Sequence, residues 1–511
     1  MKVKLLVLFI LAATVAGEQQ QQQQQQQQCS SDSGVFFGPK VHFPDDGSHN
    51  DNVREVLMAM GFAPTDTAAD ANLIWARWDP FEKNHASERM QKAHEQLKRL
   101  TNHQLVNQVP GLGFLVVKSE LAKMSSSISA IPRTFQLPEE HAAWQQFISS
   151  EAGKEMEWVR KNAAHRGVQI IPDLAAPQLQ ELQGVLVQQL VRPHLIGGRS
   201  WDVGVYVAIT QLEPLMAYVF TGSVLLRFCS KPYQRDITPD TDISTYVVTG
   251  LDDFTPGPQV DAMQPHYDDA YADTAMGSSM SLAALRGQLG SAGINTTKWW
   301  LDVQGTIVQV LQEAVPKMEA HRSYYYPAAR ANFFTMLRFD FMLGEQGNSY
   351  LLEVNHSPGL HRPDIDLSQQ LLSRKLVHDL ISLKGLGPEG LHNQFTNPTL
   401  TPLKYHMDSL CVGEPDCGSN CSEGKDCLKP QCKLCKKCKS LWQVVVLTNV
   451  QAEHQHAHAF MRVHPPHKAL AQHLDDAGVD WQAYFDSEQR PDSALVKMWL
   501  DKKCEQDFCW C

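Results

Sequence analysis

The chain contains 511 residues, of which 43% are hydrophobic and 20% are charged. At about 100–200 residues per domain, this length predicts roughly two to four domains, each able to bury a core. The 45 basic and 56 acidic side chains give a formal net charge of −11, so we expect no nucleic-acid partner, because no extended basic surface is available for a phosphate backbone. Beyond residue 20 there is no run of about 18 apolar residues, which excludes a multi-pass membrane protein.

The N-terminus has the order of a secretory signal. Lys2 and Lys4 precede an apolar run at 5–13, and small residues follow. We therefore predict a signal peptide at 1–17 and a protein of the secretory pathway, either in the endoplasmic reticulum lumen or secreted. The alternative is a single uncleaved N-terminal membrane anchor, for which the apolar run is short. Residues 18–34 are rich in glutamine and are predicted to be disordered.

Two segments of mixed helix and strand pattern follow. Residues 35–145 are predicted to form an N-terminal α/β domain, and residues 146–387 a larger core of mixed α and β structure. Apolar residues at helical spacing predict helices at 51–60 and 299–314. Around 155–172 the order is strand, polar loop and strand, with Lys161 and Arg166 at the loop. Such a hairpin can fold over an anion, because backbone N–H groups and basic side chains face one point. Most hairpins of this pattern are only turns, so the pattern alone decides little.

A second hairpin is predicted from two β-rich runs at 337–343 and 350–355, which flank six residues rich in Gly, Asn and Gln. If the last residue of the first run pairs with the first residue of the second, antiparallel counting places Asp340 opposite Glu353. Side-chain alternation then places Asn355 on the face of Glu353. Oxygen ligands beside a basic loop favour Mg²⁺ bridging nucleotide phosphates over zinc. The alternative is a partly solvated hairpin with incidental acids.

Ten of the 12 cysteines lie in the last part of the chain, at 411–511, after a linker predicted at 388–410. This density predicts a separate small module. Its C-x-x-C-x-x-C run at 432–438 could bind zinc through thiolates. We favour disulfides, because the predicted compartment is oxidising and the count of ten is even.

The stretch LLEVNHSP at 351–358 closely resembles the LLEVN-x-S-P signature of the tubulin-tyrosine ligase-like family. Further similarities occur in the family's order: 158–161 and the loop after it resemble the phosphate-contacting strand and covering loop, and 188–191 resembles the adenine hinge. The resemblance covers roughly residues 50–385. It implies an α+β fold, in which an ATP-grasp type ligase core follows the N-terminal α/β domain and precedes a small disulfide-rich C-terminal module.

The resemblance also implies an activity, namely ATP-dependent joining of an amino acid, often glutamate, to a protein carboxylate through an acyl-phosphate. The implied cofactors are ATP and Mg²⁺. The implied partners are a protein or peptide acceptor with carboxylate side chains and a free amino acid, and tubulin is an acceptor only if the topology is cytosolic. The implied roles are the catalytic machinery for Arg166 and Asp202, phosphate contact for Lys161, the covering loop for Arg166 and Gly167, the adenine site for Gln188, Gln189, Leu190 and Val191, and Mg²⁺ binding for Asp340, Glu353 and Asn355.

Several positions depart from the family's pattern. Where the family has Lys-Phe-Asp-x-Arg, residues 200–204 read Ser-Trp-Asp-Val-Gly, so a lysine and an arginine are absent. The family's His-Leu-Thr-Asn block corresponds to 242–245, which begins with Asp242, and Gln169 replaces a glycine of the covering loop. We therefore predict an acceptor end with reduced positive charge, which Gly204→Arg is expected to restore. The alternative function is a catalytically impaired relative that binds nucleotide or a peptide tail as an interaction module.

Overall fold

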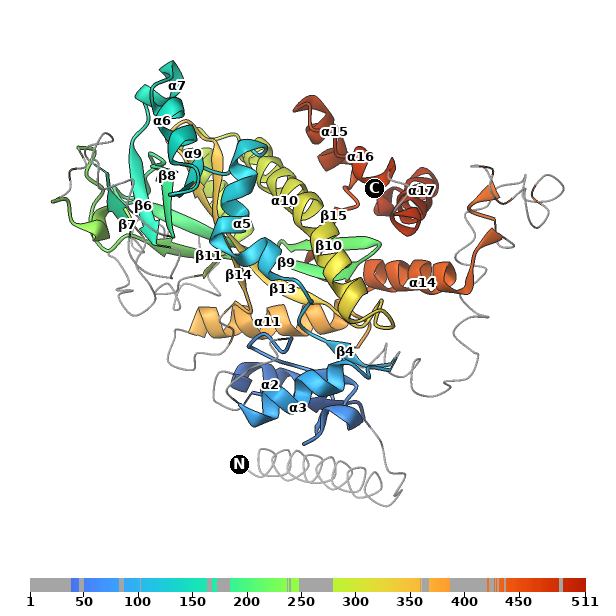
Figure 1. Ribbon diagram of the computed structural model, residues 1–511. Coiled ribbons are helices and arrows are strands. Elements are labelled where there is room, and N and C mark those ends of the chain that lie inside the picture. Colours follow the sequence, from blue (N-terminus) through green and yellow to red (C-terminus); the bar gives the residue numbers. More distant parts are fainter. Residues whose placement is uncertain are drawn as a thin grey trace, which may run out of the picture. The chain divides into compact units, whose positions relative to one another are not determined.

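The computed structural model describes residues 38–45, 50–81, 87–101, 103–162, 168–171, 184–236, 238, 240–247, 279–358, 360, 367–386, 421, 427, 429, 432–435, 438–486 and 490–511 (Figure 1). The predicted signal peptide, the Gln-rich segment and the linker at 388–410 lie outside the described residues, as do Arg166 and Gly167. Within the described ranges, no helix has both the length and the apolar character that a bilayer crossing requires.

The N-terminal part contains a small parallel sheet in the strand order β2-β1-β3-β4. The helix predicted from the pattern at 51–60 is present as α2, and it buries Val53 and Leu57, which lie one helical turn apart on the same face. The elements of this part are β1 (Lys40–His42), α2 (Asp51–Ala59), β2 (Ala63–Pro64), β3 (Leu73–Ile74), α3 (Glu88–Leu97), β4 (Leu105–Val106), α4 (Gly113–Val116) and α5 (Lys118–Lys123), with single 3₁₀ turns at Ala68–Asp70 and Met124–Ser126.

A four-stranded antiparallel sheet in the order β5-β8-β6-β7 follows. It has a small core of its own, in which Trp144 from α6 packs edge-on against Trp158 from β6. The hairpin predicted around 155–172 is confirmed as β6 and β7. The elements are β5 (Thr134–Leu137), α6 (His141–Ile148), α7 (Glu151–Lys154), β6 (Trp158–Asn162), β7 (Val168–Ile170) and β8 (Val185–Gln189).

The largest sheet has seven strands and is organised around β9, whose twelve residues are all buried. β9 pairs antiparallel with β10, β11 and β13, and β13 pairs in turn with β14. The bounds are β9 (Trp201–Leu212), β10 (Leu215–Phe220), β11 (Ser223–Phe228), β12 (Ser279–Ser281), β13 (Thr335–Leu343), β14 (Ser349–His356) and β15 (Phe460–His464), with a 3₁₀ turn at Ile243–Thr245.

Helices cover both faces of this sheet, with α10 on one side and α11 on the other (Figure 1). Val203, Val205 and Val207 of β9 face α10, whereas Tyr206 and Ala208 face the side of α11, as expected for alternating side chains. The helical pattern predicted α10, although the helix runs further in both directions, from its Asn295 cap past Pro316. The bounds are α9 (Leu282–Ser291), α10 (Thr296–Tyr325) and α11 (Leu367–Leu383).

The C-terminal region contains the predicted disulfides but is not a detached module. β15 pairs with β10 and so becomes part of the large sheet. Glu453 of α14, 3% exposed, accepts hydrogen bonds from Thr210 Oγ1 and Tyr218 OH on that sheet, both at 2.9 Å. The remaining elements are α14 (Leu441–Gln455), α15 (Lys468–Asp476), α16 (Ala483–Asp486), α17 (Pro491–Gln506) and a 3₁₀ turn at Phe508–Trp510.

Disulfides join Cys421 to Cys432, Cys427 to Cys438 and Cys504 to Cys511. The preference for disulfides over zinc is therefore confirmed at these cysteines. The argument from an even count does not hold throughout, because Cys509 is an exposed free thiol. Its neighbours in sequence pair without it, so the number of cysteines alone did not decide the pairing.

Candidate active site

The β13–β14 hairpin places the predicted acids as expected, although by a different register near the turn. Asp340 lies opposite Glu353, in agreement with the sequence prediction. Next to the turn, however, Leu343 pairs with Ser349, one residue away from the expected partner. An irregularity directly after Asp340 absorbs this shift and keeps the two acids opposite each other.

The three side chains predicted as Mg²⁺ ligands meet on one face of the hairpin. Asn355 Nδ2 donates to Asp340 Oδ2 at 2.8 Å and to Glu353 Oε1 at 3.1 Å. The Asp340 side chain is 1% exposed, whereas Glu353 is only half-buried and lines a cavity. The structure therefore brings all three together, with Glu353 nearest to solvent.

Two arginines, neither of them predicted, bind the same carboxylates. Arg338, two residues before Asp340 on β13, donates from Nε to Asp340 Oδ1 at 2.6 Å and from Nη2 to Oδ2 at 2.9 Å. Arg227 on β11 donates to both oxygens of Asp202 at 2.8 Å, and its Nη2 also reaches Asp340 Oδ2 at 2.8 Å. Paired guanidinium and carboxylate forks of this kind are strong and directional.

Strand pairing explains this convergence. Arg227 lies opposite Asp202 across β11 and β9, and Asp340 lies opposite Gly204 across β13 and β9. Because alternate residues of a strand share a face, these positions form a row across four neighbouring strands. We call this row the carboxylate–arginine cluster; it consists of Asp202, Arg227, Arg338, Asp340, Glu353 and Asn355.

Burial and charge act in opposite directions on the acids of the cluster. Burial raises the pKa of Asp202; the Arg227 guanidinium opposes the rise and the neighbouring Asp340 adds to it. Burial also favours a higher pKa for Asp340, but Arg227 and Arg338 outweigh it and hold the pKa of this carboxyl below its ordinary value. Asp340 is therefore the group that stays ionised in the middle of the cluster.

The donor chemistry of the cluster fits Mg²⁺, because carboxylate and amide oxygens on one face are ligands that this ion accepts. The Glu353 carboxylate lines the cavity and is available to a cation there. Asn355 would have to turn its amide, since Nδ2 now faces both acids. No group of three or more His, Cys, Asp and Glu side chains in the described ranges is arranged to hold a metal ion, so any ion here depends on the amide as well.

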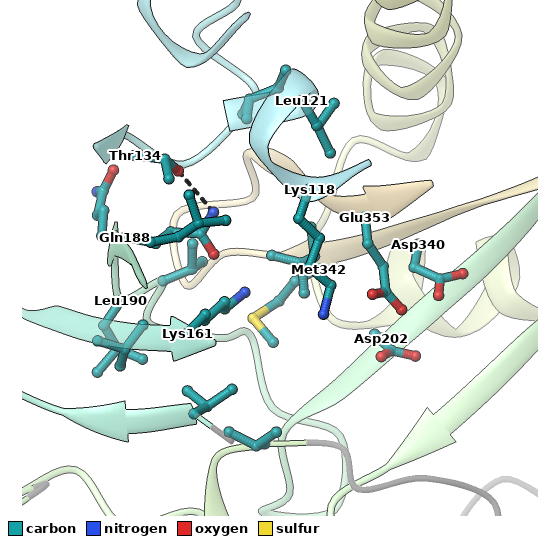
Figure 2. A pocket seen from close by; sticks show the side chains of 18 of the residues that line it. Lys118, Leu121, Thr134, Lys161, Gln188, Leu190, Asp202, Asp340, Met342 and Glu353 are labelled. Carbon is teal, nitrogen blue, oxygen red and sulfur yellow. Dashed lines mark hydrogen bonds between the residues drawn. The ribbon is translucent and has the colours of Figure 1, made fainter. Parts of the chain in front are cut away.

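A cavity of about 300 Å³ lies between the four-stranded sheet and the cluster (Figure 2). Asp202, Asp340 and Glu353 close one end. The other walls come mainly from the four-stranded sheet, from α5 and from the residues after β8. Of the predicted site residues, the cavity is lined by Lys161, Gln188, Gln189, Leu190, Val191, Asp202, Asp340 and Glu353.

Two lysines enter the cavity from different elements. Figure 2 shows the amino groups of Lys161 on β6 and Lys118 on α5 pointing into the space in front of Glu353. Burial lowers the pKa of Lys161 to about 8; Glu353 opposes this and the nearby Lys118 adds to it. Two ammonium groups facing acids across an open cavity are suited to an anionic ligand that carries its own cation.

The predicted adenine hinge forms the opposite wall. Gln188 at the end of β8 is buried, and its Nε2 donates to Thr134 Oγ1 at 2.8 Å. The Leu190 N–H donates to the Glu157 carbonyl oxygen at 2.8 Å, which anchors the chain after the strand. Apolar side chains, among them Ile131, Leu186 and Met342, also line the cavity. A flat apolar group can lie here against a fixed backbone.

The positions that depart from the family pattern have local partners. Gln169 lies opposite Arg160 in the β6–β7 hairpin and accepts from its Nε at 2.7 Å. Asp242 caps the 3₁₀ turn by accepting from the Ser244 N–H at 2.9 Å, and it forms an ion pair with Lys231. Gln169 and Asp242 thus make contacts near the site but are not among the residues that line the cavity.

The expectation of reduced positive charge at positions 200–204 needs correction. Ser200 is fully buried and Gly204 has no side chain, as the sequence indicated. The adjoining strands nevertheless supply Arg227 and Arg338 at the same place. The effect of Gly204→Arg stays a prediction, and the substitution requires Arg338 to shift, because a Cβ on residue 204 would lie 2.7 Å from Arg338 Cδ.

Sequence reasoning missed four residues of the site, namely Lys118, Thr134, Arg227 and Arg338. One signal was available, because Arg338 and Asp340 are two residues apart in a strand and must share a face. A single arginine in the apolar run of β11 was a second signal. The pairing of Arg227 with Asp340, 113 positions apart, left no local trace.

These features define the class of protein: it has an ATP-grasp type ligase core. In this core, a cavity separates a small antiparallel sheet from acidic side chains on a larger sheet. Residues 89–386 match the model of the tubulin-tyrosine ligase family. The chain belongs to this family, as the LLEVNHSP signature suggested.

Several curated relatives share the similarity. The protein named probable tubulin polyglutamylase ttll-15 of Caenorhabditis elegans is 26% identical over 479 residues, which covers 91% of this chain and 84% of the relative. The mouse tubulin monoglutamylase TTLL4 is 26% identical over 313 residues, covering 56% of this chain and 24% of the relative. The human tubulin polyglutamylase TTLL6 is 25% identical over 348 residues, covering 65% and 36%. The aligned region thus spans most of the worm protein but only a minor part of the two mammalian ones.

Proposed function

We propose that this protein is an ATP- and Mg²⁺-dependent amino-acid ligase that joins an amino acid, most simply glutamate, to a carboxylate of a protein or peptide acceptor. Membership of the tubulin-tyrosine ligase family supports an amino-acid ligase, since the relatives are named as glutamylases of tubulin. The acceptor, the nucleotide and the chemical route are the proposal.

One observation carries the proposal: the cavity has its two lysines opposite its acids, with an apolar wall at the far end. An adenine ring on the wall beside Gln188 would place its phosphates between Lys118 and Lys161. The terminal phosphate would then approach Glu353. The apolar surface would then contact the base, the cationic surface the phosphates and the acidic surface the metal ion, in the order in which these parts occur in a nucleotide complex.

The residues of this chain would divide the work as follows. Lys118 and Lys161 bind phosphate oxygens, and Glu353 with Asp340 and Asn355 would hold Mg²⁺, which neutralises charge on the phosphoryl group. The acceptor carboxylate attacks the terminal phosphorus, ADP leaves, and an acyl-phosphate forms. The amine of the incoming amino acid then attacks the acyl carbon and releases phosphate, giving an amide. The covering loop with Arg166 and Gly167 is assigned to this machinery by resemblance alone.

The acceptor follows from the compartment. With the predicted N-terminal signal, the acceptor is a protein of the secretory pathway that carries carboxylate side chains. The disulfides among the described cysteines fit an oxidising compartment. Tubulin is the acceptor only if the catalytic core faces the cytosol. Locating the mature N-terminus by mass spectrometry of the protein purified from cells separates cleavage from an uncleaved anchor.

The decisive experiment is ligation by the purified full chain. Labelled glutamate, Mg²⁺, ATP and an acidic acceptor peptide should give a labelled peptide and release phosphate, whereas omission of ATP should give neither. Glycine and tyrosine, offered in place of glutamate, test the choice of amino acid. No labelled peptide under any of these conditions, from a protein that ATP stabilises against heat, would exclude the ligase.

The second candidate is a catalytically impaired relative that binds nucleotide or peptide. One observation favours it: both oxygens of Asp340 accept hydrogen bonds from arginines, which compete with a metal ion for this carboxylate. In that case ATP should stabilise the protein without release of phosphate, and the acidic peptide should bind without being modified.

A further inference from the structure

Arg338 and Gly204 compete for one space in the large sheet. Gly204 on β9 lies opposite Asp340, and the stem of Arg338 passes over the glycine. A Cβ built on residue 204 would lie 2.7 Å from Arg338 Cδ and 3.1 Å from its Cγ and Nε. Contacts this short require a shift, so a side chain at 204 and the observed position of the Arg338 stem exclude each other.

We propose that Arg338 supplies, from β13, the guanidinium that this sequence lacks at position 204, and that Arg227 and Arg338 together bind the carboxylate of the acceptor. This inference rests on the proposed function and deepens it by naming the acceptor site. The guanidinium group thus comes from the neighbouring strand, and the absence of a side chain at Gly204 leaves space for the methylene groups of Arg338.

The hydrogen bonds of the two arginines leave donors for such a carboxylate. Arg338 uses Nε and Nη2 on Asp340, and Arg227 uses Nε and Nη2 on Asp202 and Asp340. Neither Nη1 group donates to another residue in the described part of the chain. Because an arginine carries five N–H donors in a rigid fork, each retains an amino group for an incoming anion.

Their position also suits this role. Both Nη2 atoms bond to the same Oδ2 atom of Asp340, so the two guanidinium groups lie side by side. The side chains of Arg227 and Arg338 are 16% and 13% exposed, which leaves each a contact with solvent. Arg227 lines the cavity beside Glu353. An acceptor carboxylate held here would lie next to the phosphates proposed for the cavity.

The acidic partners hold the two guanidinium groups in place through hydrogen bonds. An arginine side chain stays protonated at physiological pH, so the charge of Arg338 persists. A guanidinium already held by two hydrogen bonds loses little conformational entropy when it binds an anion. The chemistry selected is a carboxylate flanked by further acidic groups, as in a glutamate-rich peptide.

The test measures binding of a fluorescent glutamate-rich peptide by anisotropy, without ATP, so that it does not depend on ligation. Arg338→Met keeps the length of the stem and removes the charge. We expect it to weaken peptide binding by roughly tenfold or more, measured at a temperature at which the variant is fully folded. The control is Arg235→Met, an exposed arginine paired with Glu345 outside the cavity, which should leave the peptide affinity unchanged.

A swap of the two positions tests the exclusion directly. Gly204→Arg alone should lower the melting temperature, because the new side chain meets Arg338. Arg338→Ala alone should weaken peptide binding. The double variant Gly204→Arg with Arg338→Ala should lose the thermal penalty and regain peptide affinity over Arg338→Ala, since only neighbouring sites show such coupling.

Two results would overturn the inference: equal peptide affinity for Arg338→Met and the Arg235→Met control, or additive thermal effects in the double variant. These outcomes differ from failure of the proposed function. If the peptide binds through Arg338 but is never modified, the acceptor site stands and the ligase does not. If labelled glutamate is joined to the peptide and Arg338→Met leaves peptide affinity and ligation unchanged, the ligase stands and this acceptor site does not.

Discussion

The two ends of the cavity are built in different ways. At the hinge end, Gln188 and Thr134 belong to adjacent strands of one small sheet, and the surrounding wall is apolar. At the opposite end, charged residues from four strands of the large sheet meet in the carboxylate–arginine cluster. The hinge end thus depends on a short stretch of backbone, whereas the cluster depends on a balance of buried charges, and mutations should affect the two ends differently.

The largest effect is expected from Asp340→Asn. It removes the charge of the carboxylate to which both arginines donate, while almost preserving the side-chain volume. Breaking a buried ion pair typically costs about 3–5 kcal/mol, because an unpaired charge remains buried. Urea unfolding measures the loss. The control is Asp501→Asn in an exposed pair with Lys497, for which a change within about 0.5 kcal/mol is expected. Equal stability of the two variants would mean that the arginines find other partners.

Glu353→Gln should separate binding from stability at the same end of the cavity. Glu353 is half-buried and accepts a hydrogen bond from Asn355, which glutamine can also accept, so the fold should survive the loss of charge. Most of the thermal stabilisation by ATP and Mg²⁺ should disappear, since the accessible cation ligand is gone. Glu345→Gln at the turn of the same hairpin is the matched control. An unchanged shift with ATP in Glu353→Gln would remove this residue from the site.

The third prediction concerns pH and the phosphate region between the two ends. Burial lowers the pKa of Lys161 from its ordinary value of 10.5 to about 8. Between these values the unfolded chain holds a proton that the folded chain has released, so the stability relative to Lys161→Met should rise with pH across this window. Stabilisation by ATP should fall over the same range, because a neutral amine no longer attracts phosphate.

Thermal shifts with and without ATP, taken from pH 7 to 10 in wild type and Lys161→Met, measure both trends. In Lys161→Met, the contributions of residue 161 to the rise in stability and to the fall in ATP stabilisation should both be absent. A constant difference in stability between the two proteins over the whole range would show that Lys161 stays charged, and that water reaches it more freely than its burial suggests.

The smallest effect is expected at the hinge end from Thr134→Val. The variant leaves the Gln188 amide without its partner at 2.8 Å. A buried amide left unpaired costs about 1–3 kcal/mol, so a modest fall in stability and a slightly weaker response to ATP should follow. Thr238→Val, whose hydroxyl pairs only locally with Thr241 on an exposed segment, is the control. A loss as large as that of Asp340→Asn would contradict the distinction between the two ends.

Local patterns predicted much of the frame. Alternation and turn composition gave the hairpin of β13 and β14 and the pairing of Asp340 with Glu353, even though the register near the turn differs by one residue. The β6–β7 hairpin, α2 and the body of α10 also followed from periodicity. The sequence pattern predicts these elements because each depends on side chains that are close in sequence and must lie on the same face.

The C-terminal region shows where such reasoning fails. Cysteine density indicated disulfides, and they are present. Nothing in the local sequence of β15 indicated that it would pair with β10, about 240 positions earlier, or that Glu453 would be buried against Thr210. Pairing with a distant strand depends on which edge remains open after the rest of the sheet has formed.

The sequence by itself determined the family, the position of the acids on one hairpin and a short segment that lines the opposite wall of the cavity, because these depend on motifs of a few consecutive residues. Only the tertiary structure decided the charge at the acceptor end. In the sequence, Gly204 indicates only the loss of a positive charge. In the folded sheet, the absence of a side chain at Gly204 leaves the space that the methylene groups of Arg338 occupy. The physical reason is that the charge and the free space at one position depend on side chains from neighbouring strands, whereas a sequence pattern describes one strand at a time.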